Sequence, residues 1–245
     1  MKEYLVCKPD YAKKTRFLPA HLIYKIENGH LFREQIPLSL NGGMMVIGKI
    51  VGNLSHTLCA KIISECYRFN FHGVFMNLPP LPDESTLDFA KTLLNMAINK
   101  NIALHLPLTY STCVGAYLTV PAINTICSFS EYLEGVCSNY PDHKLSLQLS
   151  TQPIAFKIPQ ETPNQGVPIS NHTLKELLEK SGDITFYSPD LCTNYFSCGN
   201  RFVVFDTPST LKVKRDLAEQ FAFDSCLYLI PPKSTAVLQK LEENL

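Results

Sequence analysis

Residues 69–82 read FNFHGVFMNLPPLP, and this stretch decides the fold. The apolar run from Gly73 to Leu78 has the length and composition of a buried strand. It follows a segment of helical periodicity and leaves through prolines toward a second helical segment. A buried strand between two helices is typical of a parallel sheet in an α/β protein. We therefore predict that residues 73–78 form a central strand of such a sheet.

Apolar stretches of similar length recur along the chain, separated by helical or loop segments. They cover residues 4–7, 21–26, 44–50, 73–78, 102–106, 125–129, 144–149, 184–187, 202–205 and 226–230. This series suffices for eight barrel strands and a hairpin, and 245 residues fit a single α/β barrel. We predict a (β/α)8 TIM barrel, irregular or trimmed in places, as one domain over residues 1–245.

Helices are predicted where a capping residue precedes helical periodicity. They cover residues 55–69 after Ser55, 83–100 after Asp83 or Ser85, 170–181 after Ser170, 207–221 with Thr207 before Pro208, and 234–245. Ser85 and Asp88 have the spacing of a capping box. Residues 152–170 contain four prolines and predict an irregular excursion instead of a helix.

The composition excludes several classes of function. Lys+Arg and Asp+Glu balance at 22 each, which argues against a nucleic-acid binder. No apolar run reaches the ~18 residues of a membrane span, and the N-terminal sequence has no signal-peptide pattern, so we expect a cytoplasmic protein. The nine cysteines include no Cys-x-x-Cys, and no dinucleotide-binding glycine pattern occurs. We predict no metal site and no cofactor.

Four passages follow one another in an order that is familiar from one enzyme family. Residues 21–31, HLIYKIENGHL, run from a strand into an Asn-Gly turn, and residues 44–69 combine a strand with a helix. Residues 69–79 hold the next strand, and residues 187–230 hold the pair Tyr195-Phe196, a strand ending at Asp206 and a helix from Ser209. Together they resemble the chitinase-like barrels of glycoside hydrolase family 18, particularly the compact bacterial type associated with spores and peptidoglycan. The resemblance implies a TIM barrel related to glycan hydrolysis.

The departures from the family are concentrated at the fourth strand. The family carries there an acidic signature, Asp-x-x-Asp-x-Asp-x-Glu, often with a glycine after a preceding Asp. If Gly73 is that glycine, His72 precedes it, Phe75 and Asn77 replace the inner carboxylates, and Pro79 replaces the catalytic Glu. That acid protonates the glycosidic oxygen, and proline has no ionisable side chain with which to do so.

Two further features of the family are missing. Its Tyr-Asp pair after the sixth strand is expected near residues 125–130, which read TICSFS. Its Trp on the last strand meets Tyr228 or Leu229, and the chain contains no Trp. The resemblance therefore implies a non-catalytic or strongly divergent barrel, a pseudoenzyme that binds a glycan or a protein partner.

Other residues keep alternative functions open. Asp83 and Glu84 can be a relocated acid/base pair, or simply the cap and first-turn acid of a helix. Asp206 is a third candidate acid for an active hydrolase of altered chemistry. Cys113, Cys127 or Cys137 can be a nucleophile that is partnered by His143. The alternative is that these cysteines are buried, inert thiols.

Polar residues near the predicted strand ends are candidates for a ligand pocket, since barrel ligands bind at the carboxyl ends of the strands. They are Lys49, Asn77, His105, Ser130, Gln148 and Asp206, with Tyr228 at the position of the missing Trp. The alternative for His105 is a hydrogen-bonded core residue. A structural protein with a filled barrel and no cleft is the third functional hypothesis.

Overall fold

A computed structural model describes residues 1–9, 15–35, 40–158, 166–229 and 243. The chain divides into two compact units. The first comprises residues 1–120, 140–148 and 223–228, and the second comprises residues 121–139, 149–222 and 229–245. Each unit has its own sheet and its own buried apolar cluster. One domain over residues 1–245 stays a prediction.

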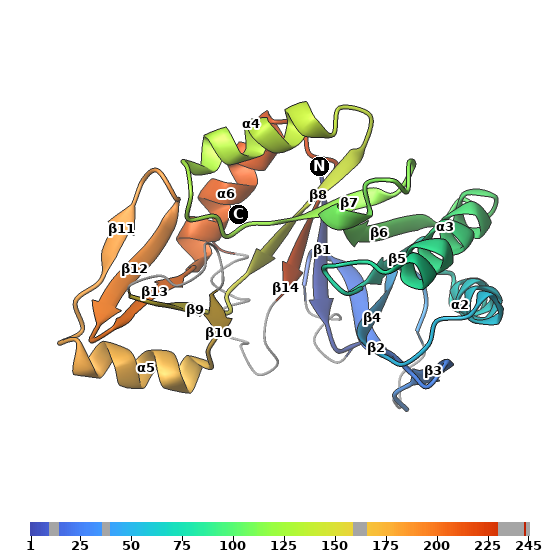
Figure 1. Ribbon diagram of the computed structural model, residues 1–245, viewed down its shortest axis with the longest axis horizontal. Coiled ribbons are helices and arrows are strands. Elements are labelled where there is room, and N and C mark those ends of the chain that lie inside the picture. Colours follow the sequence, from blue (N-terminus) through green and yellow to red (C-terminus); the bar gives the residue numbers. More distant parts are fainter. Residues whose placement is uncertain (10–14, 36–39, 159–165, 230–242, 244–245) are drawn as a thin grey trace. The chain divides into compact units, whose positions relative to one another are not determined.

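The first unit is built around a nine-stranded sheet with the order β1-β14-β8-β7-β6-β5-β4-β2-β3 (Figure 1). Its strands are β1 (Lys2–Cys7), β2 (Leu18–Glu27), β3 (His30–Arg33), β4 (Met44–Val51), β5 (Gly73–Met76), β6 (Ala103–Pro107), β7 (Tyr117–Pro121), β8 (Lys144–Ser150) and β14 (Ser225–Leu229). An additional pairing of β1 with β2 closes eight of them into a barrel. The pairings from β1 through β2, β4, β5 and β6 to β7 are parallel. The predicted TIM-type barrel is confirmed.

Strand β3 lies outside the closed ring because β2 is longer than its barrel partner β1. Residues 18–21 of β2 pair with β1, and residues 24–27 pair with the antiparallel β3. The turn between β2 and β3 is Asn28-Gly29, with φ angles of 51° and 74°. Two successive left-handed residues suit a tight hairpin turn, which explains the Asn-Gly pair.

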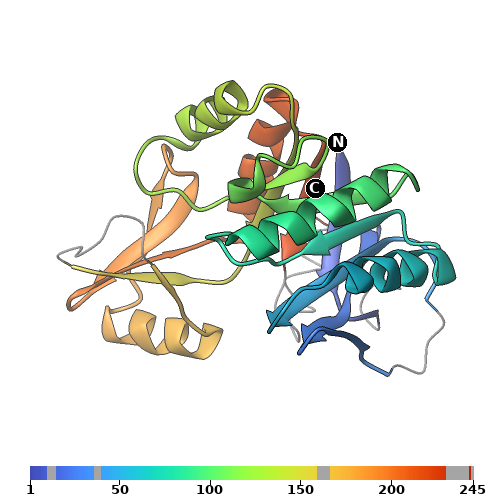
Figure 2. The same ribbon diagram turned by 45° about the vertical axis from the view of Figure 1, so that its right-hand side comes forward.

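The helices α2 (His56–Arg68) and α3 (Glu84–Ile98) pack side by side on the outer side of the barrel (Figure 2). Their apolar faces share one buried cluster with alternate residues of the neighbouring strands, including Met45, Ile47, Val74, Met76, Leu104 and Leu106. Successive strand residues point to opposite faces. The intervening positions, among them Phe75 and His105, therefore face the barrel interior.

The second unit contains an antiparallel sheet with the order β10-β9-β13-β12-β11. Its elements are β9 (Ile154–Lys157), β10 (Val167–Pro168), β11 (Phe186–Ser188), β12 (Thr193–Cys198), β13 (Arg201–Phe205), α4 (Phe129–Asn139), α5 (Asn171–Lys180) and α6 (Pro208–Gln220). Helix α5 covers one face of the sheet, where Leu177 packs with Phe196 and Val203 (Figure 1).

The capping signals of the second unit are confirmed. The Ser170 side chain accepts a hydrogen bond from the Thr173 amide at the start of α5, and Thr207 does the same with Thr210 at the start of α6. Gly182, with a φ of 75°, follows the end of α5, and glycine is the residue that most readily adopts this left-handed conformation at a helix end. The helix predicted over residues 234–245 lies outside the described residues except for residue 243.

The strand predicted at residues 125–129 is wrong. The sixth barrel strand is β7, which ends at Pro121, and Phe129 already begins α4. The physical reason is a capping box: Ser128 Oγ accepts from the Glu131 amide at 3.2 Å, while the Ser128 amide donates to the Glu131 carboxylate at 3.0 Å. The Ser-x-x-Glu spacing that signals this helix is visible in the sequence.

Three smaller predictions also need correction. The strand predicted at residues 202–205 is β13, in the antiparallel sheet and not in the barrel, and the strand predicted at residues 184–187 is β11, which begins two residues later in the same sheet. The excursion over residues 152–170 has no helix in its described part, as predicted, but the strands β9 and β10 pair within it. Ser85 and Asp88 form no capping box, since Asp83 is the cap of α3 and Asp88 bonds to His56 at 2.7 Å.

Candidate functional site

Barrel active sites lie at the carboxyl ends of the strands, and the resemblance places the family's acid at the end of β5. Val74, Met76 and Leu78 lie in the outer cluster with α2 and α3. Phe75 and Asn77 therefore face inward, as the alternation of strand residues requires. Phe75 is buried and Asn77 is exposed. The inward positions of this strand end thus carry a phenyl ring and an amide.

Asn77 and the prolines after it are held by neighbouring strands and loops. The Asn77 side-chain amide donates to the Gly48 carbonyl at 3.3 Å, and its backbone amide donates to the Ile47 carbonyl at 3.2 Å. The Tyr110 hydroxyl donates to the Pro79 carbonyl at 3.1 Å. These hydrogen bonds hold the loop that follows β5 in place. Residues 73–82 contain no carboxylate.

Asp83, the nearest carboxylate in sequence, caps helix α3. Its side chain accepts a hydrogen bond of 2.7 Å from the Thr86 amide. Hydrogen bonds from Thr86 lower the pKa of the Asp83 carboxyl below its ordinary value. Glu84 is exposed in the first helical turn. The cap and first-turn interpretation of this pair is therefore the one that the structure shows.

Lys49 lies near the carboxyl end of β4 with its side chain 64% exposed. Glu27 accepts from Lys49 at 3.3 Å and is 3.0 Å from the Lys25 ammonium group. The Lys25 ammonium group is also 5.8 Å from the centre of the Phe32 ring, which is 45% exposed. An exposed polar and aromatic surface therefore continues from Lys49 onto the β2–β3 hairpin.

His105 lies two residues before the end of β6, inside the barrel, and is 1% exposed. Its Nδ1 is hydrogen-bonded to Ser146 Oγ at 3.0 Å, and Ser146 Oγ is 2.6 Å from Ser225 Oγ. The His105 ring stacks on Tyr117 at 4.6 Å. Burial lowers the pKa of His105 to about 3, so the imidazole is neutral. The alternative of a hydrogen-bonded core histidine is confirmed.

Gln148 and Tyr228 face opposite sides of the barrel wall. Ser146 faces inward, so Gln148, two residues further along β8, also faces the interior and is half-buried. Ser225 faces inward as well, which directs Tyr228 outward. The Tyr228 hydroxyl donates to Glu3 at 3.2 Å, and its ring lies 4.9 Å from the Phe17 ring. Tyr228 therefore does not replace the missing Trp in a ligand site.

Ser130 and Asp206 belong to the second unit, so they are not barrel strand ends. Ser130 is exposed in the first turn of α4. Asp206 follows β13 and is buried, with Lys214 Nζ at 2.7 Å from its Oδ2. The hydroxyls of Thr193 and Thr210 donate to its Oδ1 at 3.0 Å and 2.9 Å. A carboxylate with three donors and a buried counter-ion is a structural ion pair.

Sequence reasoning missed the polar chain inside the barrel because Ser146, Ser225 and Tyr117 lie far apart in sequence. Period-two alternation in β8 is the signal that could have found Ser146. Similarly, β7 ends at Pro121, eight residues before the end of the strand predicted at residues 125–129. The residues at that end, 121–124, read PAIN and still contain neither Tyr nor Asp.

The cysteine candidates are divided between the two units, with Cys113 in the first unit, as is His143, and with Cys127 and Cys137 in the second. All nine cysteines are free, and burial raises the pKa of Cys113 and of Cys137. His143 Nε2 is 2.8 Å from the Ser111 carbonyl. Within the described residues, no group of three or more His, Cys, Asp or Glu side chains can hold a metal ion.

Fold and strand ends together define a closed α/β barrel with a fourth strand end that lacks a carboxylate. Solved chitinases and spore cortex-lytic enzymes share this fold. A chitinase from Chromobacterium violaceum aligns with 99% of this chain and 98% of its own, at a TM-score of 0.66 and 13% identity. The cortex-lytic enzyme SleL of Bacillus megaterium aligns with 98% of this chain and 73% of its own, at a TM-score of 0.61 and 13% identity.

A class V chitinase mutant from Nicotiana tobaccum, solved in complex with NAG4, aligns with 99% of this chain and 98% of its own, at a TM-score of 0.61 and 10% identity. The sequence matches no protein-family model and no curated protein. The resemblance to family 18 barrels is thus confirmed for the fold. In the part of the chain that the structure describes, none of the helices combines the length and apolar character of a membrane span.

Proposed function

We propose that this chain is a non-catalytic barrel that binds a glycan at the carboxyl ends of its strands. The observation that carries the proposal is the absence of any carboxylate in residues 73–82. Glycoside hydrolysis needs a carboxylic acid beside the scissile bond. Phe75 and Asn77 hold the inward positions, and Pro79 follows them.

The described candidates for a relocated acid do not support hydrolysis. A general acid must keep its proton near neutral pH, which requires a raised pKa. The pKa of Asp83 is instead lowered by its hydrogen bonds to Thr86. Asp206 is buried against Lys214, and Glu84 is exposed on α3. An active hydrolase of altered chemistry is therefore the weaker hypothesis.

A glycan is the ligand that this strand-end surface fits best. Sugars are bound by amide and charged side chains that exchange hydrogen bonds with hydroxyls, together with exposed aromatic rings. Asn77 and Lys49 supply the first kind, and Phe32 supplies the second. The Nicotiana tobaccum neighbour with the same fold was solved with NAG4. A protein partner at the same surface is the other outcome that the experiment distinguishes.

The test combines NAG4 titration by calorimetry with an assay for its cleavage. We expect binding without turnover. Asn77→Ala should weaken NAG4 binding about 5- to 10-fold, the effect of losing one hydrogen bond of ~1 kcal/mol. Asn95→Ala, at an exposed position on α3, is the matched control and should leave the affinity unchanged.

Two results would contradict the proposal. One is the absence of binding to NAG4 and to longer chitin oligosaccharides, which would leave a protein ligand as the better hypothesis. The other is cleavage that disappears in Asp83→Ala or Glu84→Ala, which would establish an active hydrolase.

A further inference from the structure

A hollow of about 350 Å³ lies between α2 and the β2–β3 hairpin of the first unit. Among the described residues, its lining includes Arg33, Lys61 and Arg68 and a single carboxylate, that of Glu65. Three cations and one anion leave a net charge of +2 at this place, in a chain whose formal net charge is 0. The positive charge is therefore concentrated at this hollow.

Glu65 orients both arginines but can neutralise only one of them. Arg33 Nη1 is 3.8 Å from one carboxylate oxygen of Glu65, and Arg68 Nη1 is 3.4 Å from the other. The Tyr24 hydroxyl donates to the same carboxylate at 3.1 Å. Tyr24 is only 3% exposed, and its ring is fixed in the outer cluster. A buried side chain thus sets the position of Glu65.

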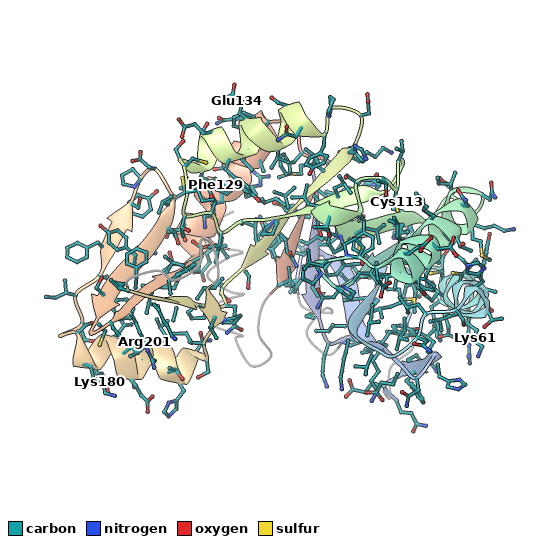
Figure 3. The ribbon with its side chains drawn as sticks, in the orientation of Figure 1. Lys61, Cys113, Phe129, Glu134, Lys180 and Arg201 are labelled. Atoms are coloured by element: carbon teal, nitrogen blue, oxygen red, sulfur yellow. The ribbon has the colours of Figure 1, made fainter. Side chains whose placement is uncertain are left out.

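The ring of Phe69 supports the same two arginines. The guanidinium carbon of Arg33 is 4.6 Å from the ring centre, and that of Arg68 is 5.2 Å away. The attraction of both cations to one ring holds the two guanidinium groups beside it. Each guanidinium has five N–H donors, and both groups line the hollow, so donors remain for a ligand. The side-chain amide of Gln35 and the ammonium of exposed Lys61 add further donors. Lys61 is labelled on α2 in Figure 3.

We propose that this hollow binds a ligand through an oxyanion, a carboxylate or a phosphate group, held by Arg33, Lys61 and Arg68. Pre-oriented guanidinium groups match the paired oxygens of both anions. The hollow is on the outer side of the barrel, because Tyr24 belongs to the cluster with α2 whereas Asn77 faces inward. The oxyanion site is therefore separate from the proposed glycan surface and does not depend on it.

The experiment titrates the full chain with inorganic phosphate and, separately, with acetate. Sodium chloride holds the ionic strength constant, since salt screens exposed charges. The signals of the Gln35 side-chain amide and of the arginine Nε–H groups report binding by NMR. We expect saturation at one site, with a Kd on the order of millimolar. Saturation by one anion alone identifies the ligand group, and saturation by both identifies a general oxyanion site.

Variants separate this site from unspecific attraction. Arg33→Gln and Lys61→Gln should each lower the affinity at least roughly fivefold, and Arg33→Lys should also lower it because lysine keeps the charge but not the planar fork. Lys91→Gln, which removes an exposed charge on α3, is the matched control and should stay within about twofold. NAG4 binding should be unchanged in all four variants.

The proposal fails if neither anion saturates the signals. It also fails if Arg33→Gln and Lys61→Gln bind like the unmodified chain, or if Lys91→Gln loses as much affinity as they do. None of these results affects the glycan proposal, whose own test uses NAG4 and Asn77→Ala.

Discussion

The barrel and the second unit each bury polar side chains, and they satisfy them in different ways. Inside the barrel, His105 is uncharged and joined to Ser146 and Ser225 by hydrogen bonds. In the second unit, Asp206 is paired with Lys214. The Asp206 side chain is 0% exposed and the Lys214 side chain is 1% exposed. A neutral group needs only hydrogen-bond partners, whereas a buried charge needs a counter-ion as well. Burial of a titratable residue therefore does not by itself mark an active site.

The largest effect should come from breaking the charged pair. Lys214→Met leaves the Asp206 carboxylate buried without its counter-ion, and we expect the free energy of unfolding to fall by about 3–5 kcal/mol. Urea denaturation measures this change. Lys212→Met, two residues away with a 41% exposed side chain, is the control and should cost less than about 1 kcal/mol.

A double variant sharpens the same test. Asp206→Asn combined with Lys214→Met removes both charges but keeps an oxygen that accepts from Thr193 and Thr210. It should be more stable than Lys214→Met alone. A double variant as unstable as the single one would show that packing around Lys214, including the Phe129 ring at 5.5 Å, matters more than charge.

The neutral site should be less costly to break. His105→Ala removes the ring that stacks on Tyr117 and leaves a cavity beside Ser146. We expect a loss of about 2–3 kcal/mol in the free energy of unfolding. His172→Ala, at a side chain that is 82% exposed, is the matched control. Equal effects of the two substitutions would contradict a core role for His105.

The neutral histidine also predicts a pH dependence. The pKa of His105 is lowered by burial to about 3, below its ordinary value of 6.5. Above pH 6.5 the His105 imidazole is neutral in both the folded and the unfolded chain, and its contribution to the free energy of unfolding is fully present. Between pH 6.5 and 3 only the unfolded chain takes up the proton, so stability should fall by about 1.4 kcal/mol per pH unit.

Urea denaturation at pH 7, 6 and 5 checks this slope against a His105→Gln variant. Burial also lowers the pKa of His21, so part of the slope should remain in the variant. The difference between the two proteins isolates His105. Identical slopes would show that His105 is not held neutral in the folded chain.

Much of the barrel was predictable because its signals are local. The strand at residues 73–76 and the helix after Asp83 follow from apolar runs and a cap within a few residues. Residues 125–129 misled the prediction because a short apolar run fits a strand as well as a helix start, and the Ser128–Glu131 box decides for the helix.

The candidate site was less predictable, because the sequence shows that a residue follows a strand but does not show which sheet that strand joins. Asp206 does follow a strand, but β13 belongs to the antiparallel sheet, and Lys214 reaches its carboxylate from two turns further along α6. The hydrogen-bond partner of His105, Ser146, lies 41 residues away along the chain. By contrast, the lack of a carboxylate in residues 73–82 needs no structure to be seen.

The smallest effect extends the comparison to an exposed carboxylate. Asp83 caps α3 through its 2.7 Å hydrogen bond, whereas Ser55 caps α2 without a side-chain bond to the helix backbone. Asp83→Ala should therefore lower the free energy of unfolding by about 1 kcal/mol, and Ser55→Ala by only a few tenths. Urea denaturation of both variants gives the difference. If Asp83→Ala lowered the free energy of unfolding as much as Lys214→Met does, the Asp83 carboxylate would have a partner beyond the cap. Water can replace a hydrogen bond that is lost at an exposed helix end. It cannot reach the buried Asp206–Lys214 pair.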